Sequence, residues 1–250
     1  VYSKTRLSEK PSYRDNLLNS TRKGYSFYFA NIGVSPYKYV CRITTSDFQY
    51  GTGYLVGPNL LLTCAHCVFA DRDPSKAFSG WTCYPRYDDG LDSSLVYSSG
   101  WDKIYYSTGY TESIFDSTSE KYDWCLCVLS EPLGTKMGDW LATAAYSEDS
   151  NLNTIPVQAI GYPRVYDESE GIYRFSGKVM HYSTGTIFNT NPLYFDTNAK
   201  TYSGMSRGPV INTDNSYVIG IIKGNHKDDS DTTYVVRLTT ALVNLINSLS

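Results

Sequence analysis

The sequence has little that would direct it to a nucleic acid or into a membrane. Its 250 residues carry 22 lysines and arginines against 25 acids, a formal net charge of −3, and no dense basic run occurs. Because such a surface does not attract a polyanion, we expect no nucleic-acid partner. No apolar run approaches the roughly 20 residues of a membrane-spanning helix, so we expect no membrane span. The first residues do not show the pattern of a signal peptide.

Cysteine and histidine are also scarce. Six cysteines are too few for a disulfide scaffold in a chain of this length, so we expect most to be buried free thiols, with one or two bridges left open. Cys125 and Cys127 lie two apart in an apolar run, which places both on one face of a strand. The three histidines are not in ligand spacing, and the pair Cys64 and Cys67 has no second pair to complete a site. We therefore expect neither a metal nor a cofactor.

Short strand-like runs dominate what is present. Hydrophobic residues make up 41% of the chain and charged residues 19%, and tyrosine occurs 24 times, which favours strands and tight turns in a globular fold. Apolar residues three and four apart predict one closing amphipathic helix over Thr239–Ser250, with Thr240 available as its cap. Many short strands indicate a sandwich or barrel. The clearest runs are Tyr39–Thr44, Thr52–Val56, Leu60–Thr63, Trp81–Tyr84, Trp124–Leu129, Val157–Ile160, Tyr173–His181, Leu193–Asp196, Pro209–Ile211, Tyr217–Ile222 and Thr233–Leu238.

Three segments are expected along the chain. Residues 1–30 are polar, charged and without periodicity, so they are interpreted as an N-terminal arm. The stretch Leu141–Asn153 has no strong pattern and is where we place the link between two halves. We therefore predict one β-domain over 31–140 and a second over 141–250, the latter ending in the helix.

Ser206 lies in a segment suited to nucleophilic catalysis. Gly204, two residues before it, lets the backbone turn so that two amides face one point. The amides of Gly204 and Ser206 would then hold an oxyanion. The same Gly-x-Ser-x-Gly spacing fits the nucleophile elbow of α/β-hydrolases, which needs a helix next and places its acid and histidine later in the chain. Here a strand-like run, Pro209–Ile211, follows, and alternating strands and helices are absent, so the elbow is less favoured.

His66 and Asp123 are the candidate partners of this serine. His66 follows a predicted hairpin whose second strand ends at Thr63, which places it at a barrel rim. A strand-end histidine satisfied by backbone groups is the plain alternative. Asp123 opens a buried strand, where a carboxylate is costly unless it is hydrogen-bonded. A histidine Nδ1–H is a suitable partner and would fix the tautomer that a general base requires.

Together these segments resemble the chymotrypsin-like serine peptidases. Thr63–Cys67 (Thr-Cys-Ala-His-Cys) resembles the family's Thr-Ala-Ala-His-Cys, and Asp123–Leu126 (Asp-Trp-Cys-Leu) its Asp-x-Ala-Leu. Gly204–Val210 (Gly-Met-Ser-Arg-Gly-Pro-Val) is similar to Gly-Asp-Ser-Gly-Gly-Pro-Val, and the order His, Asp, Ser is the family's order. The resemblance covers roughly residues 34–250. It implies an all-β fold of two six-stranded antiparallel barrels with a C-terminal α-helix, and a catalytic triad of His66, Asp123 and Ser206 in the cleft.

Within the family, the pattern is closest to the glutamyl endopeptidases. Gly161–Pro163, Ser176–Val179 and Val218–Ile221 look like their C-terminal barrel, and the terminal helix fits as well. This resemblance implies a protein or peptide substrate and a monomer. It also implies a secreted or extracytoplasmic location, which the glycosylation sequon Asn19–Thr21 supports weakly.

Two departures near the serine bear on activity. Met205 replaces the aspartate that pairs with a new N-terminus in trypsin-like zymogens, so activation by that ion pair is not expected. Arg207 replaces the usual small residue after the nucleophile. Its side chain could crowd the leaving-group side, bind substrate acids, or shift the backbone that forms the oxyanion hole.

A third departure concerns specificity. Thr201 matches a threonine of the glutamyl endopeptidase pocket, but Ile222 stands where a histidine is expected. Lys200, Lys223 and the adjoining Gly224 complete the predicted substrate-binding residues, and His226 lies close by in sequence. A cationic pocket for an acidic substrate residue and lysines that point to solvent are equally open.

The leading hypothesis is therefore a serine endopeptidase that acts through an acyl-enzyme. The alternative is a catalytically impaired homologue that binds proteins in its cleft, which Arg207 favours. An esterase of the α/β-hydrolase type comes third.

Overall fold

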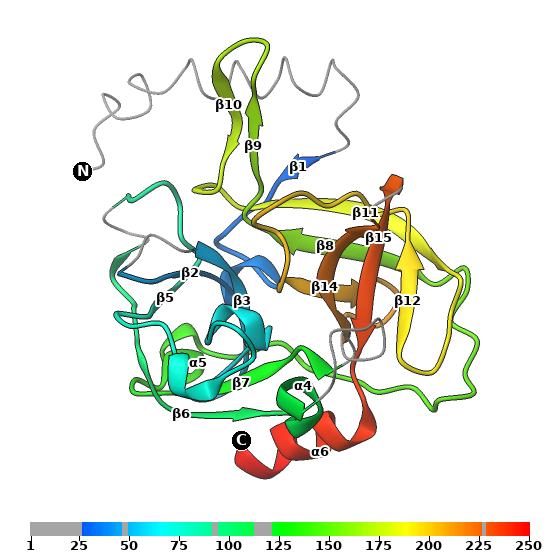
Figure 1. The fold of residues 1–250 in the computed structure, drawn as a ribbon, viewed down its shortest axis with the longest axis horizontal. Coiled ribbons are helices and arrows are strands. Elements are labelled where there is room, and N and C mark those ends of the chain that lie inside the picture. The colour runs from blue at the N-terminus through cyan, green and yellow to red at the C-terminus, as the bar shows by residue number, and fades with distance from the viewer. Residues whose placement is uncertain (1–26, 47–49, 92–94, 113–121, 227–228) are drawn as a thin grey trace.

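The fold is built from two antiparallel sheets set side by side, seen in a computed structural model (Figure 1). The structure describes residues 27–46, 50–91, 95–112, 122–226 and 229–250. Most of the predicted arm therefore lies outside the described residues. Its last part forms a short strand, β1 (Tyr28–Phe29), that pairs with the second sheet.

The first sheet carries the strands of the N-terminal half. Its order is β5-β2-β3-β4-β7-β6, and an isolated bridge from Cys83 to Ser99 joins β5 to the chain just before β6. Alternate apolar side chains of these strands fill its interior, and β4 is buried throughout. The bounds are β2 (Val40–Thr44), β3 (Tyr50–Gly57), β4 (Leu60–Thr63), β5 (Thr82–Pro85), β6 (Trp101–Tyr106) and β7 (Cys125–Leu129).

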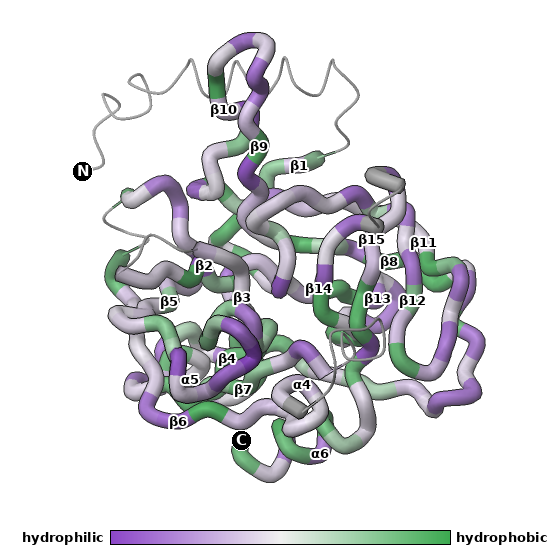
Figure 2. The backbone as a smooth tube through the Cα atoms, in the orientation of Figure 1, coloured by the Kyte–Doolittle hydropathy of each residue, from purple (hydrophilic) through white to green (hydrophobic). Residues whose placement is uncertain are grey.

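The second sheet closes into a barrel. The order β11-β12-β15-β14-β13-β8 returns to β11 through a further pairing of β8 with β11, and β1 adds to the outside of β11. Figure 2 shows hydrophobic segments along these inner strands. The expected all-β architecture with antiparallel sheets is thus confirmed. The bounds are β8 (Pro156–Gly161), β11 (His181–Phe188), β12 (Tyr194–Thr197), β13 (Pro209–Asn212), β14 (Val218–His226) and β15 (Asp229–Arg237).

One expected strand was wrong. The sequence favoured a continuous strand over Tyr173–His181, but the chain forms β10 (Ile172–Ser176), turns, and begins β11 only at His181. Gly177 causes the break, because its φ of 73° leaves the strand region and its amide donates to the carbonyl of Pro163. β10 pairs instead with β9 (Arg164–Asp167), and this hairpin projects from the body (Figure 1).

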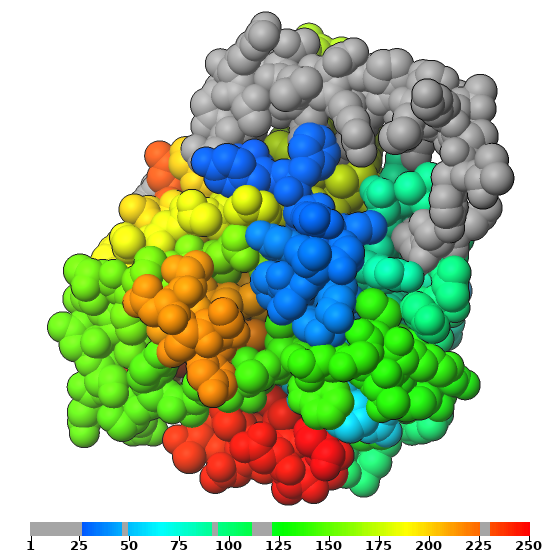
Figure 3. Space-filling view, turned by 180° about the vertical axis from the view of Figure 1, so that it is seen from behind, coloured from blue at the N-terminus to red at the C-terminus, as the bar shows by residue number. Residues whose placement is uncertain are grey.

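The predicted closing helix is confirmed as α6 (Thr240–Leu249), but its cap was misplaced. Thr239 is the cap, since its hydroxyl accepts from the amide of Leu242, and Thr240 is the first helical residue. The apolar face of α6 packs on the core of the first sheet, although the helix ends the second half. In the reverse view the chain between α5 and β8 crosses just above it (Figure 3). The remaining helices are short: α4 (Thr108–Glu112), α5 (Leu133–Met137) and the 3₁₀ turns η1 (Tyr37–Tyr39), η2 (Ala65–Cys67) and η3 (Pro74–Lys76).

No helix in the described ranges is long and apolar enough to cross a membrane.

Candidate active site

His66 stands immediately after β4, as the sequence predicted. It lies in the single turn η2, and 32% of its side chain is exposed. Its backbone amide donates to Asp123 Oδ1 at 3.1 Å, and Nδ1 lies 2.5 Å from Asp123 Oδ2. The carboxylate therefore holds both the main chain and the ring of the histidine.

Asp123 is fully buried two residues before β7. Besides His66 it binds the ammonium group of Lys223, which contacts the same oxygen, Oδ2. Burial raises the pKa of this carboxyl, but the positive charges and hydrogen bonds of His66 and Lys223 outweigh burial and hold the pKa well below its usual range. Asp123 is thus ionised, which is the state that orients a neighbouring imidazole.

Asp123 in turn acts on His66. Burial lowers the pKa of its imidazole, but the charges of Cys67 and Asp123 and the Asp123 hydrogen bond outweigh that and raise the pKa to about 9. Because Nδ1 faces the carboxylate, Nδ1 carries the proton in the neutral ring and Nε2 is the basic atom. The ring is therefore presented in the tautomer that a general base needs.

Ser206 lies in a tight turn whose backbone is held from both sheets. Gly204 has φ of 88°, and its carbonyl accepts from the hydroxyl of Thr52 on β3 at 2.8 Å. That hydroxyl also accepts from the amide of Tyr162, so one side chain fastens the turn to both halves. Neither the Gly204 nor the Ser206 amide donates to any described residue. The two amides are available to an oxyanion, as the sequence predicted, although that role stays a proposal.

Arg207 takes the place at the histidine that a serine hydroxyl would occupy. Its Nε donates to His66 Nε2 at 3.2 Å, and its Nη1 donates to the carbonyl of Tyr50 at 3.2 Å. No hydrogen bond joins Ser206 Oγ to a described residue. A protonated imidazole could not accept from Arg207, so this contact belongs to the neutral ring, the form that prevails above the raised pKa of about 9. The sequence flagged Arg207 as unusual, but it held no signal for a contact with His66, 141 positions away.

The predicted substrate-binding residues divide into two lysines that form ion pairs and three uncharged residues, Thr201, Ile222 and Gly224. Both lysines are paired with acids of the chain: Lys200 Nζ lies 2.9 Å from Asp231, and Lys223 binds Asp123. Thr201 donates to the side chain of Asn225, Ile222 is buried, and Gly224 (φ 146°) lies beside Ser206 with room at its Cα. His226 lies in β14, but its side chain is outside the described set.

The six cysteines are all free and buried, which confirms the expectation of unpaired thiols. Sγ of Cys125 and Sγ of Cys127 are 3.9 Å apart on one face of β7, as their spacing predicted. Cys64, His66 and Asp123 each bring one potential metal ligand within 4.8 Å of the others. The Asp123 oxygens in that group already bind His66 and Lys223.

Comparison with known proteins now identifies the family. A family model described as a trypsin-like peptidase domain matches residues 51–221, which is more than half of the chain. The chain belongs to this family. The resemblance to chymotrypsin-like serine peptidases that the three motifs indicated is therefore confirmed, and the trypsin-like domain spans parts of both sheets.

Individual relatives agree with this assignment. The chain is 27% identical over 187 residues to a glutamyl endopeptidase of Bacillus licheniformis, an alignment that covers 74% of this chain and 52% of the relative. It thus spans about half the length of that curated relative. A solved Glu endopeptidase superposes with TM-score 0.72 at 22% identity, covering 90% of this chain and 96% of that one. A thermostable serine protease from an extremophilic microorganism gives 0.68 at 15% identity, covering 87% and 98%. These two structures show the fold.

Proposed function

We propose that the protein is a serine endopeptidase with Ser206 as nucleophile, His66 as general base and Asp123 as the group that orients the base. The observation that carries the proposal is the double contact of Asp123 with the ring and backbone amide of His66. It fixes the ring so that Nε2 faces the segment containing Ser206, as the Arg207 contact at Nε2 reports. Family membership supports the reaction class.

The chemical steps follow from these positions. Nε2 of His66 takes the proton of Ser206 as Oγ forms a bond to the substrate carbonyl carbon. The amides of Gly204 and Ser206 would hold the negative oxygen of the tetrahedral intermediate, a contribution worth about 10²–10³ in rate for each donor. His66 then gives the proton to the leaving amine as the C–N bond breaks, and water releases the acyl group by the same route. Arg207 has to leave Nε2 before the first step.

We propose that Lys200 binds an acidic substrate residue before the scissile bond and so sets the specificity. Lys223 is committed to a fully buried carboxylate, whereas the Lys200 pair has side chains 33% and 74% exposed. An exposed pair contributes only about 0–1 kcal/mol, so a substrate carboxylate can compete for this lysine. Comparing cleavage of matched Glu and Gln peptides by the native protein and by Lys200→Gln tests this. An unchanged Glu-to-Gln ratio would exclude Lys200.

The endopeptidase proposal is tested with a serine-directed phosphonate. Native protein should be labelled on Ser206 and should cleave a mixed protein substrate, whereas folded Ser206→Ala should do neither. Thr201→Ser serves as a folded control that keeps the hydroxyl and should still be labelled. Labelling of another serine, or cleavage that survives in Ser206→Ala, would refute the assignment.

A second candidate function is a protein-binding module without turnover. The observation that favours it is the occupation of His66 Nε2 by Arg207, which removes the base from the serine. Folded native protein that the phosphonate never labels, and that Arg207→Gly does not rescue, would establish this alternative.

A further inference from the structure

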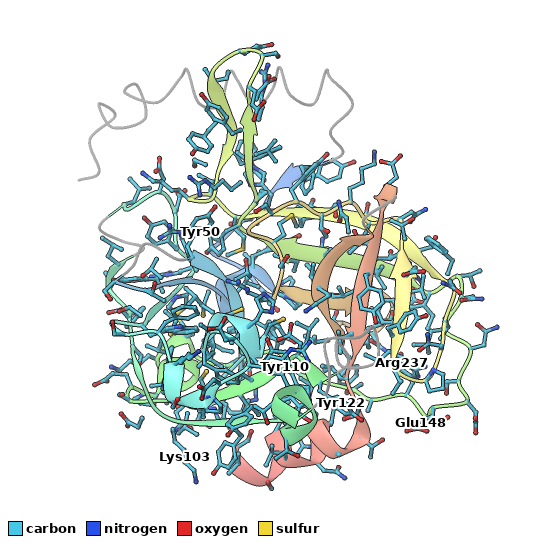
Figure 4. The ribbon with its side chains drawn as sticks, in the orientation of Figure 1. Tyr50, Lys103, Tyr110, Tyr122, Glu148 and Arg237 are labelled. Carbon is cyan, nitrogen blue, oxygen red and sulfur yellow. The ribbon has the colours of Figure 1, made fainter. Side chains whose placement is uncertain are left out.

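Arg207 belongs to a group of three arginines gathered around one tyrosine. The guanidinium carbons of Arg42 and Arg164 lie 5.5 Å and 5.2 Å from the ring centre of Tyr50, and Arg207 donates to the carbonyl of that tyrosine. We call Arg42, Arg164 and Arg207 the arginine cluster. Figure 4 shows Tyr50 between the base of the β9–β10 hairpin and the strands of the first sheet. The cluster therefore draws on both halves of the molecule.

The positive charge of the cluster has no carboxylate to balance it among the described residues. The ion pairs of the described residues involve other basic groups. The cluster instead contacts neutral groups: Arg42 donates to the carbonyl of Gly177, and Arg164 donates to the hydroxyl of Tyr173 at 2.6 Å. Hydrogen bonds with Tyr50 and Tyr173 raise the pKa of Arg164, so it stays charged. Three arginines that share Tyr50 as a neighbour, and that pair with no carboxylate of the described residues, offer positive charge to a bound anion.

The contact of Arg207 with His66 Nε2 points to the leaving-group side of the nucleophile as the place of the cluster. A Cβ on Gly224, in the predicted pocket for the residue before the scissile bond, would stand 3.8 Å from Ser206 Oγ. A Cβ on Gly204 would stand 3.4 Å from the Tyr50 ring, so Tyr50 packs against the turn two residues before Ser206. The leaving amine has to meet His66 Nε2, and Arg207 Nε is the group found there. Substrate residues after the scissile bond would therefore pass over the arginine cluster.

We propose that Arg42, Arg164 and Arg207 form a subsite for an acidic substrate residue on the C-terminal side of the scissile bond, and that the substrate carboxylate draws Arg207 away from His66. This deepens the endopeptidase proposal and rests on it for the turnover step. Arginine matches a carboxylate in a forked, charge-assisted pair. The guanidinium is charged in both contacts, and a charged carboxylate accepts from it more strongly than a neutral imidazole does, so exchange of the imidazole for a carboxylate is favourable.

The consequence is activation by the correct substrate. Once Arg207 binds the carboxylate, Nε2 regains its lone pair and can take the Ser206 proton. A substrate without the acid leaves Arg207 on the base. The acid therefore acts on kcat as well as on binding, which an ordinary docking contact would not do.

Binding tests the subsite without requiring turnover. Folded Ser206→Ala is titrated with peptide pairs that carry Asp or Asn at one position, moved in turn along the peptide. At one position the Asp peptide should bind about tenfold more tightly, as expected for one net charge-assisted hydrogen bond. Raising the salt from about 0.05 M to about 0.5 M should reduce that ratio. Equal affinities for every Asp and Asn pair would overturn the subsite.

Variants separate the cluster from general charge effects. Arg164→Gln, added to Ser206→Ala, should remove most of the Asp preference. Arg86→Gln is the matched control, because Arg86 also lies over a tyrosine ring, that of Tyr97. This variant should leave the ratio of Asp to Asn peptide affinities unchanged. A loss of preference as large in Arg86→Gln as in Arg164→Gln would overturn the assignment to the cluster.

Turnover tests the release of His66. In the native protein kcat for the Asp peptide should exceed kcat for the Asn peptide, and Arg207→Gly should raise the Asn value toward the Asp value. Equal kcat values in a protein that the phosphonate labels would overturn the release step. A protein that the phosphonate labels neither in its native form nor as Arg207→Gly, but whose Asp preference in binding persists, would refute the endopeptidase function and leave the subsite standing.

Discussion

The pair of Lys223 and Asp123 offers a prediction whose size can be worked from the structure. Asp123 is fully buried and Lys223 keeps 22% of its side chain exposed. We expect Lys223→Met to leave the carboxylate paired with His66 alone. The methionine keeps the apolar stem of the lysine and removes its charge, so the change reports mainly on electrostatics.

The magnitude follows from the burial of the two partners. A unit-charge pair at close contact gains about 4 kcal/mol at an effective dielectric constant near 20. Removing one partner of a buried pair typically costs about 3–5 kcal/mol, because the other charge stays buried. Lys223 is partly hydrated and His66 still contacts the carboxylate, so we expect a loss of about 2–3 kcal/mol in the free energy of unfolding.

The sign of the pH dependence is fixed by the carboxyl. The folded-state pKa of Asp123 lies below its unfolded value, so its stabilisation is present above about pH 4 and is lost as the pH falls through the folded pKa. Without Lys223 that folded pKa is higher, so the variant loses the stabilisation at a higher pH. The gap between native protein and variant should thus be widest near neutral pH and should narrow in acid.

Urea unfolding followed by the fluorescence of the four tryptophans measures this gap. Lys76→Met is the matched control, because the Lys76–Asp71 pair has side chains 54% and 74% exposed. We expect that control to leave stability nearly unchanged, because water screens an exposed pair. A Lys223→Met effect as small as the control, or one equally large at about pH 7 and about pH 3, would refute the reasoning.

Three further predictions follow from the site and its supports. Peptidase activity should rise with pH through the raised pKa of His66, because the base must be neutral. A profile of kcat/KM against pH whose half-maximum lies at or below about pH 6.5 would contradict this. Thr52→Val should leave two buried backbone groups unpaired and cost about 1–3 kcal/mol and much of the activity, which Thr52→Ser should retain. Gly208→Ala should not fold, because its Cβ would lie 2.0 Å from the carbonyl of Ile160, whereas Gly138→Ala, with open space around it, should fold with a loss of about 1 kcal/mol.

Local sequence patterns predicted the parts of the site that local structure positions. The apolar run ending at Thr63 places His66 past the end of β4, and the run after Asp123 places that acid at the mouth of β7. Antiparallel pairing of β4 with β7 then brings Thr63 opposite Cys125, which sets the two residues side by side. A strand pattern and the order of the motifs were enough for this part.

The sequence did not predict which long side chains make contact across large sequence separations. Lys223 was assigned to a substrate pocket, and nothing in its neighbours indicates that it reaches an aspartate 100 positions earlier. The edge strand β6 was also missed, since Trp101–Tyr106 is only partly buried and lacks a clear alternation of apolar and polar residues. Which long side chain meets which charge depends on how the two sheets pack, and periodicity carries no information on that.

The backbone at Arg207 explains why its side chain matters. Its φ of 85° lies in the left-handed region, where a residue with a Cβ is strained by about 1–3 kcal/mol and glycine is not. The amide of Arg207 donates to the carbonyl of Ile222, so the turn is held in place regardless of the side chain. The hydrogen bonds from the charged guanidinium to His66 and Tyr50 contribute about 1.5–3 kcal/mol each, which is enough to offset the strain. Because both acceptors of the guanidinium are uncharged, a carboxylate that forms stronger bonds to the same group is able to displace these contacts.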